Sequence, residues 1–146
     1  MEKVCPRCMS ASFANGDTPR LSVILPIFNE EQSLPSLYQR LSQVLQSSKD
    51  EYELIFVNDG SADRSAELLE DLAKHDPRVR VVALSRNFGH QVALSAGLDH
   101  SRGRAVAIMD ADLQDPPEVL LGFLEKWRQG YAVVYAVRKH RKEGFL

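Results

Sequence analysis

The feature that most constrains the fold is an alternation of short apolar runs with segments of helical periodicity. The runs are nearly continuous and rich in branched residues, as expected for strands covered on both faces. In the segments between them, apolar residues recur three or four positions apart, as on one face of a helix. The expected strands are residues 21–28, 52–57, 79–84, 105–109 and 132–137, and the expected helices include residues 34–45, 66–73 and 116–129.

This order of elements predicts the α/β fold class. Strands that alternate with helices through short connections form a mostly parallel sheet, because each parallel crossover needs its helix. A further helix is expected around the small residues Ala93, Ala96 and Gly97, packed close to the sheet. The sequence therefore predicts a Rossmann-like sheet with helices on both faces.

Two short stretches place Asn or Asp three residues before Gln or Glu, which is the spacing of a capping box at the start of a helix. Asn29-Glu-Glu-Gln32 matches a capping box, and Asp115-Pro-Pro-Glu118 places an acceptor before two prolines and a glutamate. Asn29, Asp115 and Glu118 are therefore predicted to shape the chain rather than to take part in chemistry.

Polar residues follow the strands where each one ends. Because the carboxyl ends of parallel strands meet at one edge, a ligand of such a sheet binds in the crevice beyond them. Clusters at five strand ends on one edge therefore predict a binding site rather than five routine turns. The residues concerned are Asn29 and Glu30, Asp59, Arg86 and Asn87, Asp110 to Asp115, and Arg138.

Asp110 and Asp112 are the candidate metal ligands of this edge. Neither a dinucleotide-binding glycine motif nor a P-loop motif is present. The negative charge of a phosphate-containing ligand would therefore have to be neutralised in another way. In an extended chain, two residues that are two positions apart point to the same side. Two convergent carboxylates suit Mg²⁺ or Mn²⁺, which commonly bridge to a ligand's phosphates.

Composition narrows the possible partners. The 146 residues suit about one domain, and a formal net charge of −2 excludes the broadly basic surface of a nucleic-acid binder. No apolar run is long enough to cross a bilayer, and a signal-peptide pattern is missing, so a cytoplasmic location is expected. Residues 1–20 are expected to form a flexible leader. In it, Cys5 and Cys8 are either reduced thiols or half of a shared metal site.

Four ordered motifs resemble those of the family 2 glycosyltransferases with the GT-A fold. The likeness extends from residue 21 to residue 146 and is greatest to the branch that glycosylates polyprenyl phosphates, such as dolichol-phosphate mannose synthase. Members of that family continue further, so the resemblance implies that residues 21–146 are the donor-binding part of a GT-A domain. The motifs are Pro26-Ile-Phe-Asn-Glu30, Val57-Asn-Asp-Gly-Ser-Ala-Asp63, Arg86-Asn-Phe-Gly-His-Gln91 and Met109-Asp-Ala-Asp-Leu-Gln-Asp-Pro-Pro-Glu118.

The resemblance implies a role for each matching residue. Asp110, Asp112 and Gln114 would hold Mg²⁺ or Mn²⁺ against the diphosphate of a nucleotide sugar, and the two aspartates would be the catalytic pair. The nucleotide-sugar pocket would further include Pro26, Phe28, Glu30, Asp59, Arg86 and Arg138.

The implied reaction is inverting, metal-dependent transfer of a sugar from a UDP- or GDP-sugar to a polyprenyl phosphate, as in cell-envelope glycan synthesis. The terminal basic residues Arg138, Lys139, Arg141 and Lys142 are either a solvated tail or a peripheral contact with the membrane. An exposed fifth strand would also favour association with a second copy of the chain.

Two other functions are compatible with parts of the sequence. A non-catalytic protein that only binds nucleotide sugars would share every motif. A phospho-acceptor receiver domain is another five-stranded α/β fold of comparable length, but it needs an acidic pair after its first strand, an aspartate after its third and a lysine after its fifth. Here the latter two positions are Ser85-Arg86 and Arg138, which argues against a receiver domain.

Overall fold

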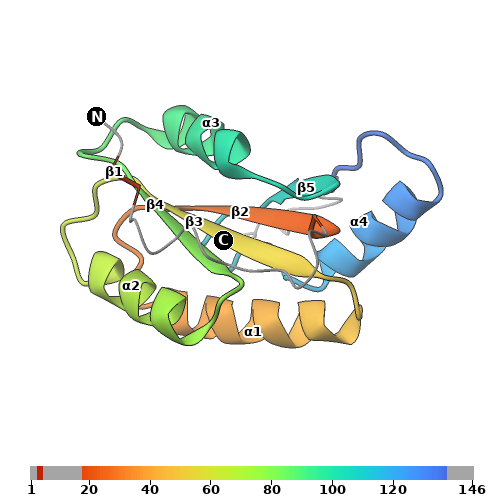
Figure 1. Cartoon of the computed structure of the whole chain (residues 1–146), viewed down its shortest axis with the longest axis horizontal. Helices are drawn as coiled ribbons and strands as arrows, with labels where there is room; N and C mark the ends of the chain where they lie inside the picture. Colours follow the sequence, from red (N-terminus) through yellow and green to blue (C-terminus); the bar gives the residue numbers. More distant parts are fainter. Residues whose placement is uncertain (1–2, 5–17, 138–146) are drawn as a thin grey trace, which may run out of the picture.

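The structure is a computed structural model, and it describes residues 3–4 and 18–137. Four helices alternate with the strands of a single sheet, as the sequence predicts (Figure 1). Arg138, Lys139, Arg141, Lys142, Cys5 and Cys8 lie outside the described residues. The elements are β1 (Lys3–Val4), β2 (Leu21–Ile27), α1 (Leu34–Ser47), β3 (Tyr52–Asn58), α2 (Ser65–His75), β4 (Val79–Ala83), α3 (His90–His100), β5 (Ala105–Ile108) and α4 (Val119–Arg128).

The sheet has the strand order β1-β4-β3-β2-β5. The pairs β2–β3, β2–β5 and β3–β4 are parallel, and they place the carboxyl ends of these strands at one edge. The short β1, from the segment expected to be a leader, pairs antiparallel with β4. The predicted α/β class with a mostly parallel sheet is therefore confirmed.

Helices cover both faces of the sheet. Figure 1 shows α3 on one side of the strands and α1 and α2 on the other. The larger core lies beneath α1, α2 and α4, where leucines such as Leu37, Leu69 and Leu120 are buried against β2 and β3. The central strands β2 and β3 are buried almost throughout because helices shield both of their faces.

Small residues let α3 lie close to the sheet, as predicted. Ala93 and Ala96 are buried against the second core, which includes Ile24 and Val57. A Cβ atom added at Gly97 would lie 2.4 Å from the Ile24 side chain. Glycine is therefore needed here for close approach, and it fixes the height of α3 above β2.

The fifth strand predicted for residues 132–137 does not form. These residues are not in a strand, and Val133 and Tyr135 are 79% and 76% exposed. The continuous apolar run is compatible with a strand, but a strand exists only where a neighbour supplies backbone hydrogen bonds. Among the described residues, β2 is the only strand that pairs with β5, so residues 132–137 do not extend the sheet.

The two predicted capping boxes are also wrong. Helix α1 begins at Leu34 with Ser33 as its N-cap, four residues beyond Asn29. Helix α4 begins at Val119 with Glu118 as its N-cap, so Asp115 lies before the cap position. The Glu118 carboxylate instead pairs with Arg40 on α1 at 3.0 Å. Both helices therefore start further along the chain than the capping-box spacing predicts.

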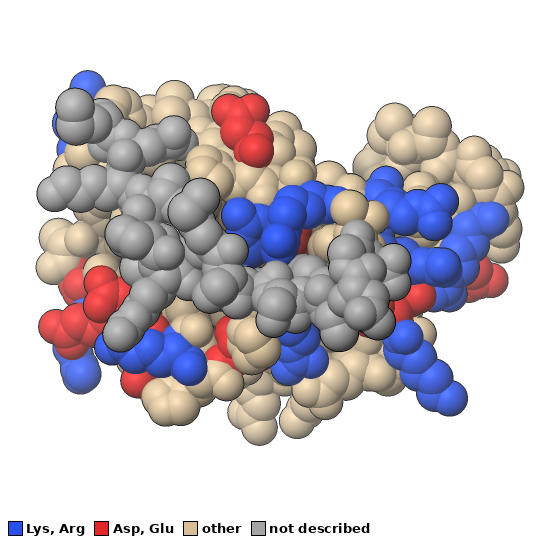
Figure 2. All heavy atoms as spheres, viewed as in Figure 1, with Lys and Arg blue, Asp and Glu red and all other residues tan. Residues whose placement is uncertain are grey.

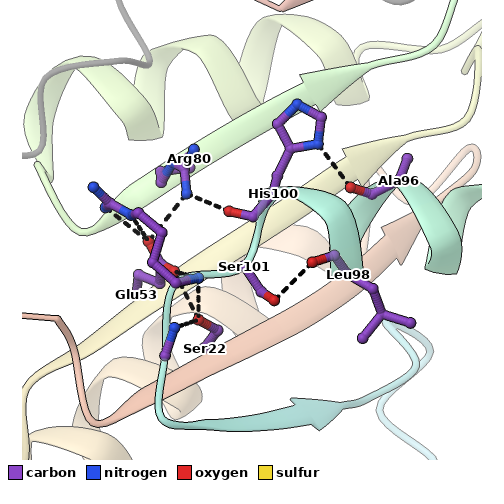
Figure 3. A network of polar contacts seen from close by, with 9 residues as sticks. Ser22, Glu53, Arg80, Ala96, Leu98, His100 and Ser101 are labelled. Carbon is purple, nitrogen blue, oxygen red and sulfur yellow. Dashed lines mark hydrogen bonds and ion pairs between the residues drawn. The ribbon is translucent and has the colours of Figure 1, made fainter.

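A buried carboxylate organises the opposite edge of the sheet (Figure 3). Glu53, near the start of β3, is 0% exposed and accepts hydrogen bonds from Ser22 Oγ at 2.6 Å and from the Arg102 backbone N–H at 2.9 Å. The Arg102 and Arg80 guanidiniums contact Oε2 of Glu53 at 2.8 and 3.2 Å. Burial alone would raise the pKa of Glu53, but the hydrogen bonds from Ser22 and Arg102 outweigh it and hold the pKa below its usual value.

Candidate active site

A pocket of about 310 Å³ opens at the carboxyl ends of the parallel strands. Phe28 and Glu30 enter it after β2, Asp59 after β3, and Asp110 and Asp112 after β5. The prediction that these strand ends meet at one edge of the sheet is therefore confirmed.

Most residues predicted for the site lie in this pocket. Pro26 lines it together with Phe28, Glu30, Asp59, Asp110 and Asp112. Arg86 and Gln114 are not among the residues that line it. The Arg86 guanidinium instead stacks on the Phe88 ring, 4.1 Å from its centroid.

A larger hollow of about 570 Å³ runs along β5 and α4. Its wall is mainly apolar, with residues such as Val106, Phe123 and Trp127, and residues 131–136 close one side. The larger hollow lacks the convergent carboxylates of the smaller pocket. The smaller pocket is therefore the better candidate for chemistry.

Asp59 connects two of the loops that form the pocket. It is 4% exposed, and its two oxygens accept hydrogen bonds from the backbone N–H groups of Phe88 and Gly89 at 2.7 and 3.0 Å. A Cβ atom at the neighbouring Gly60, whose φ is +68°, would lie 2.4 Å from the Arg86 backbone. The loop before α3 is therefore held directly against the end of β3.

Asn29 joins the loop after β2 to the loop after β3. Its N–H donates to Ser61 Oγ at 3.0 Å, and its Oδ1 accepts from the Ala62 N–H at 2.8 Å. Its φ of +55° turns the chain sharply, and asparagine tolerates this conformation better than most residues. Asn29 thus links two loops rather than capping α1.

Two acidic side chains complete the link between these loops. The Glu31 N–H donates to Asp63 Oδ2 at 3.0 Å, while Glu31 Oε2 accepts from the Arg64 N–H at 2.9 Å. Asp63 Oδ1 accepts from the N–H of Ser65, the first residue of α2, at 2.9 Å. Partial burial would raise the pKa of Asp63, but the hydrogen bonds from Ser65 and Glu31 lower it. These contacts fix Phe28 and Glu30 at the pocket.

Asp110 and Asp112 reach the same pocket through a turn rather than through the expected extended chain. Residues 111–112 form the turn, Leu113 has a φ of +60°, and Ala111 is buried between the two exposed aspartates. Asp112 Oδ1 accepts a hydrogen bond from the Gln114 backbone N–H at 3.0 Å. Gln114 thus orients Asp112 through its backbone.

Carboxylates dominate the charge of the described residues that line the pocket. Four carboxylates line it, from Glu30, Asp59, Asp110 and Asp112, and among the described lining residues there is no lysine or arginine. An anionic ligand would be repelled by this lining unless a cation accompanied it.

The two exposed aspartates suit a cation that is shared with a ligand. Within residues 3–4 and 18–137, no group of three or more His, Cys, Asp or Glu side chains could hold a metal ion. Mg²⁺, however, usually keeps several waters and binds through one or two carboxylates together with substrate phosphates. Asp110 and Asp112 fit that mode of binding.

Asn87, predicted at the end of the third strand, also lines the pocket, together with Gly89 and His90, which the sequence alone does not assign to the site. His90 is the first residue of α3. The available signal was its position within Arg86-Asn-Phe-Gly-His-Gln91, directly after one of the strand ends.

Comparison with protein families identifies the chain. The model of glycosyl transferase family 2 matches residues 22–146. The chain belongs to glycosyl transferase family 2. The family resemblance of the four motifs is therefore confirmed, and the pocket lies at the strand ends that carry those motifs.

Two curated relatives illustrate the likeness of this family 2 chain. It is 54% identical over 121 residues to the uncharacterized glycosyltransferase YkcC of Bacillus subtilis, covering 83% of this chain and 38% of the relative. It is 42% identical over 122 residues to the bactoprenol glucosyl transferase of Shigella phage SfV, covering 84% and 40%. The chain thus spans about two fifths of the length of these relatives.

A solved glycosyltransferase has a similar fold. The mannosyltransferase PcManGT of Pyrobaculum calidifontis, solved with GDP-Man and Mn²⁺, has a TM-score of 0.57 relative to this chain at 27% sequence identity. The match covers 77% of this chain and 33% of that protein. Together with the observed sheet, this likeness confirms the predicted GT-A fold. Among the described residues, none of the helices is both long and apolar enough to span a membrane.

Proposed function

We propose that the pocket at the carboxyl ends of β2, β3 and β5 binds a UDP- or GDP-sugar, and that the protein transfers the sugar to a polyprenyl phosphate. Membership of the family and the names of the relatives support this proposal, since one of them is a bactoprenol glucosyl transferase.

The observation that carries the proposal is the charge of the pocket. Four carboxylates and no lysine or arginine among the described lining residues disfavour an anion that binds alone. The same lining favours a diphosphate that arrives with a divalent cation. A nucleotide sugar with Mg²⁺ or Mn²⁺ meets that requirement, and PcManGT was solved with such a pair.

We propose a role in this donor site for each predicted residue. Pro26, Phe28 and Glu30 would flank the nucleoside, and Asp59 would approach the base from the end of β3. Asp110 and Asp112, with Gln114, would hold the cation. Arg86 and Arg138 are proposed to meet the phosphates from the loop after β4 and from the basic segment.

The proposed reaction is an inverting displacement. A phosphate oxygen of the acceptor forms a bond to the anomeric carbon while the bond from that carbon to the nucleoside diphosphate breaks, and the electron pair leaves with the diphosphate. Bound Mg²⁺ or Mn²⁺ supplies Lewis-acid stabilisation of that leaving group. Asp110 and Asp112 orient the donor, and because the acceptor is already anionic it needs little help from a general base.

The acceptor also suggests a place of action. A polyprenyl phosphate lies in a membrane, and the basic residues Arg138, Lys139, Arg141 and Lys142 are proposed to contact the anionic surface around it. Each basic residue near such a surface contributes about 1 kcal/mol. Association of two copies through the exposed residues 132–137 remains a separate proposal.

Thermal unfolding with nucleotides tests the donor site. UDP or GDP with Mn²⁺ should stabilise the chain by about 2.7 kcal/mol at a ligand concentration of 100 times Kd, and much less without the metal. The Asp112→Ala variant should lose this metal-dependent gain, because it lacks one of the two carboxylates. Asp99→Ala, an exposed aspartate at the far end of α3, is the matched control and should keep the gain. Equal stabilisation of Asp112→Ala and the parent would refute the metal assignment.

A transfer assay separates catalysis from binding alone. The protein would be incubated with a UDP- or GDP-sugar, Mn²⁺ and a short polyprenyl phosphate, and the glycolipid product measured. Metal-dependent nucleotide binding without any product would favour the non-catalytic alternative over a transferase.

A further inference from the structure

His90 has a distinctive position within the pocket. It is the first residue of α3, its side chain is 53% exposed, and its Nε2 lies 3.9 Å from Asp110 Oδ1. Among the described residues that line the pocket, only Asn87 and His90 have side chains with N–H groups. His90 is thus the one ring that can donate a hydrogen bond next to the carboxylates.

The backbone that carries His90 is fixed by buried contacts. Asp59 accepts the N–H groups of Phe88 and Gly89, the two residues before His90. Gly89 has a φ of +96° and open space around its α-carbon, so the chain turns there and enters α3 at once. The place of the imidazole relative to Asp110 therefore follows from the loop that Asp59 holds.

We infer that His90 is a positioning residue of the donor site, which orients the Asp110 carboxylate toward the shared cation. This inference rests on the proposed function, since it concerns the same site. A separation of 3.9 Å exceeds a direct hydrogen bond, so the contact is made through a bridging water or a small rotation of the exposed side chains. One oxygen of Asp110 then faces His90 and the other is left for the cation.

The expected effect follows from known behaviour of groups that orient metal ligands. Removing such a partner typically lowers metal affinity or activity about 10- to 100-fold. The side chain of His90 is half exposed, so its removal should leave the stability of the unliganded protein unchanged. The effect should therefore be confined to binding that depends on the metal.

The test compares three variants of the full chain with the parent protein. His90→Ala removes the ring, His90→Gln keeps an N–H donor, and His75→Ala removes an exposed histidine that lies 3.6 Å from Asp71 on α2. The dissociation constants of UDP and GDP are measured by calorimetry with and without Mn²⁺, together with the melting temperature without ligand. We expect His90→Ala to weaken the Mn²⁺-dependent binding about tenfold or more, His90→Gln to restore most of it, and His75→Ala to match the parent.

The outcomes separate this inference from the proposed function. If the parent binds neither nucleotide with Mn²⁺, the proposed function fails and the role of His90 fails with it. If the parent binds and His90→Ala binds equally well, the role of His90 is refuted while the donor site stands. If both His90 variants lose binding and also melt at a lower temperature without ligand, the residue is structural and the inference is overturned.

Discussion

At the amino ends of the strands, Glu53 is fully buried and contacts two arginines. At the carboxyl ends, by contrast, Asp110 and Asp112 are exposed, and none of the described residues that line their pocket is an arginine or a lysine. Figure 2 shows basic side chains in the middle of the face drawn and on its right, and α4 lies on the right of the same view in Figure 1. Near the amino ends, Asp50 also contacts two arginines, Arg20 and Arg128. The amino edge thus pairs Glu53 and Asp50 with arginines, whereas the carboxyl edge leaves Asp110 and Asp112 available to a cation.

The difference indicates how this fold separates stability from function. A buried carboxylate has to be paired, because an isolated charge in the interior is very unfavourable. Exposed carboxylates keep their hydration and can remain unpaired. The molecule therefore uses the buried Glu53 at one edge to hold the chain together and the exposed Asp110 and Asp112 at the other edge, we propose, to bind.

The largest expected effect is the loss of the buried acid. Glu53→Ala leaves Arg80, Arg102 and Ser22 without their shared acceptor and should lower the free energy of unfolding by about 3 kcal/mol. Urea denaturation of the variant and the parent measures this. Glu51→Ala, which removes an exposed glutamate two positions earlier in the chain, is the control and should change stability little. A Glu53→Ala variant as stable as the parent would contradict the structural role of this edge.

The same edge should make folding sensitive to acid. Because the pKa of Glu53 in the folded protein is lowered, its contribution is complete above its ordinary value of 4.5 and is lost as the pH falls through the folded-state pKa. Asp76, which pairs with Arg78, and Asp63 also have lowered pKa values, so the comparison must isolate Glu53. The stability of Glu53→Gln should therefore fall less steeply than that of the parent below pH 4.5. Parallel curves from urea denaturation at several pH values would argue against this linkage.

The smallest expected effect concerns the pocket without ligand. Asp112→Asn keeps the oxygen that accepts the Gln114 N–H but removes one of the four clustered charges. The unliganded stability should stay the same or rise by about a few tenths of a kcal/mol, since exposed charges interact weakly in water. Thermal unfolding at low and high salt measures this. A large loss of stability would mean that the acids at the carboxyl edge hold the fold together as Glu53 does, and the contrast between the edges would disappear.

The sequence predicted the elements well where the signal is local. The apolar runs of β2 and β3 and the small residues Ala93, Ala96 and Gly97 each constrain their own surroundings, and the structure confirms them. Convergence of Glu30, Asp59 and Asp110 was also predictable, because parallel connectivity alone places successive strand ends at one edge.

The errors arose where a local pattern depends on a distant partner. Residues 132–137 form an apolar run typical of a strand, but no described strand pairs with them. Asn29 has the spacing of a helix cap, yet its side chain binds Ala62, 33 positions away. Propensity cannot rank such alternatives, because the competing contact lies on another element.

The sequence by itself therefore determined the α/β order, the edge at which the polar residues meet and the family motifs, since periodicity and chain direction are encoded locally. Only the tertiary structure decided that Asp59 holds the loop before α3, that Asn29 and Asp63 join two loops, and that His90 faces Asp110. The physical reason is that hydrogen bonds between residues some 30 positions apart exist only after the sheet has brought their loops together.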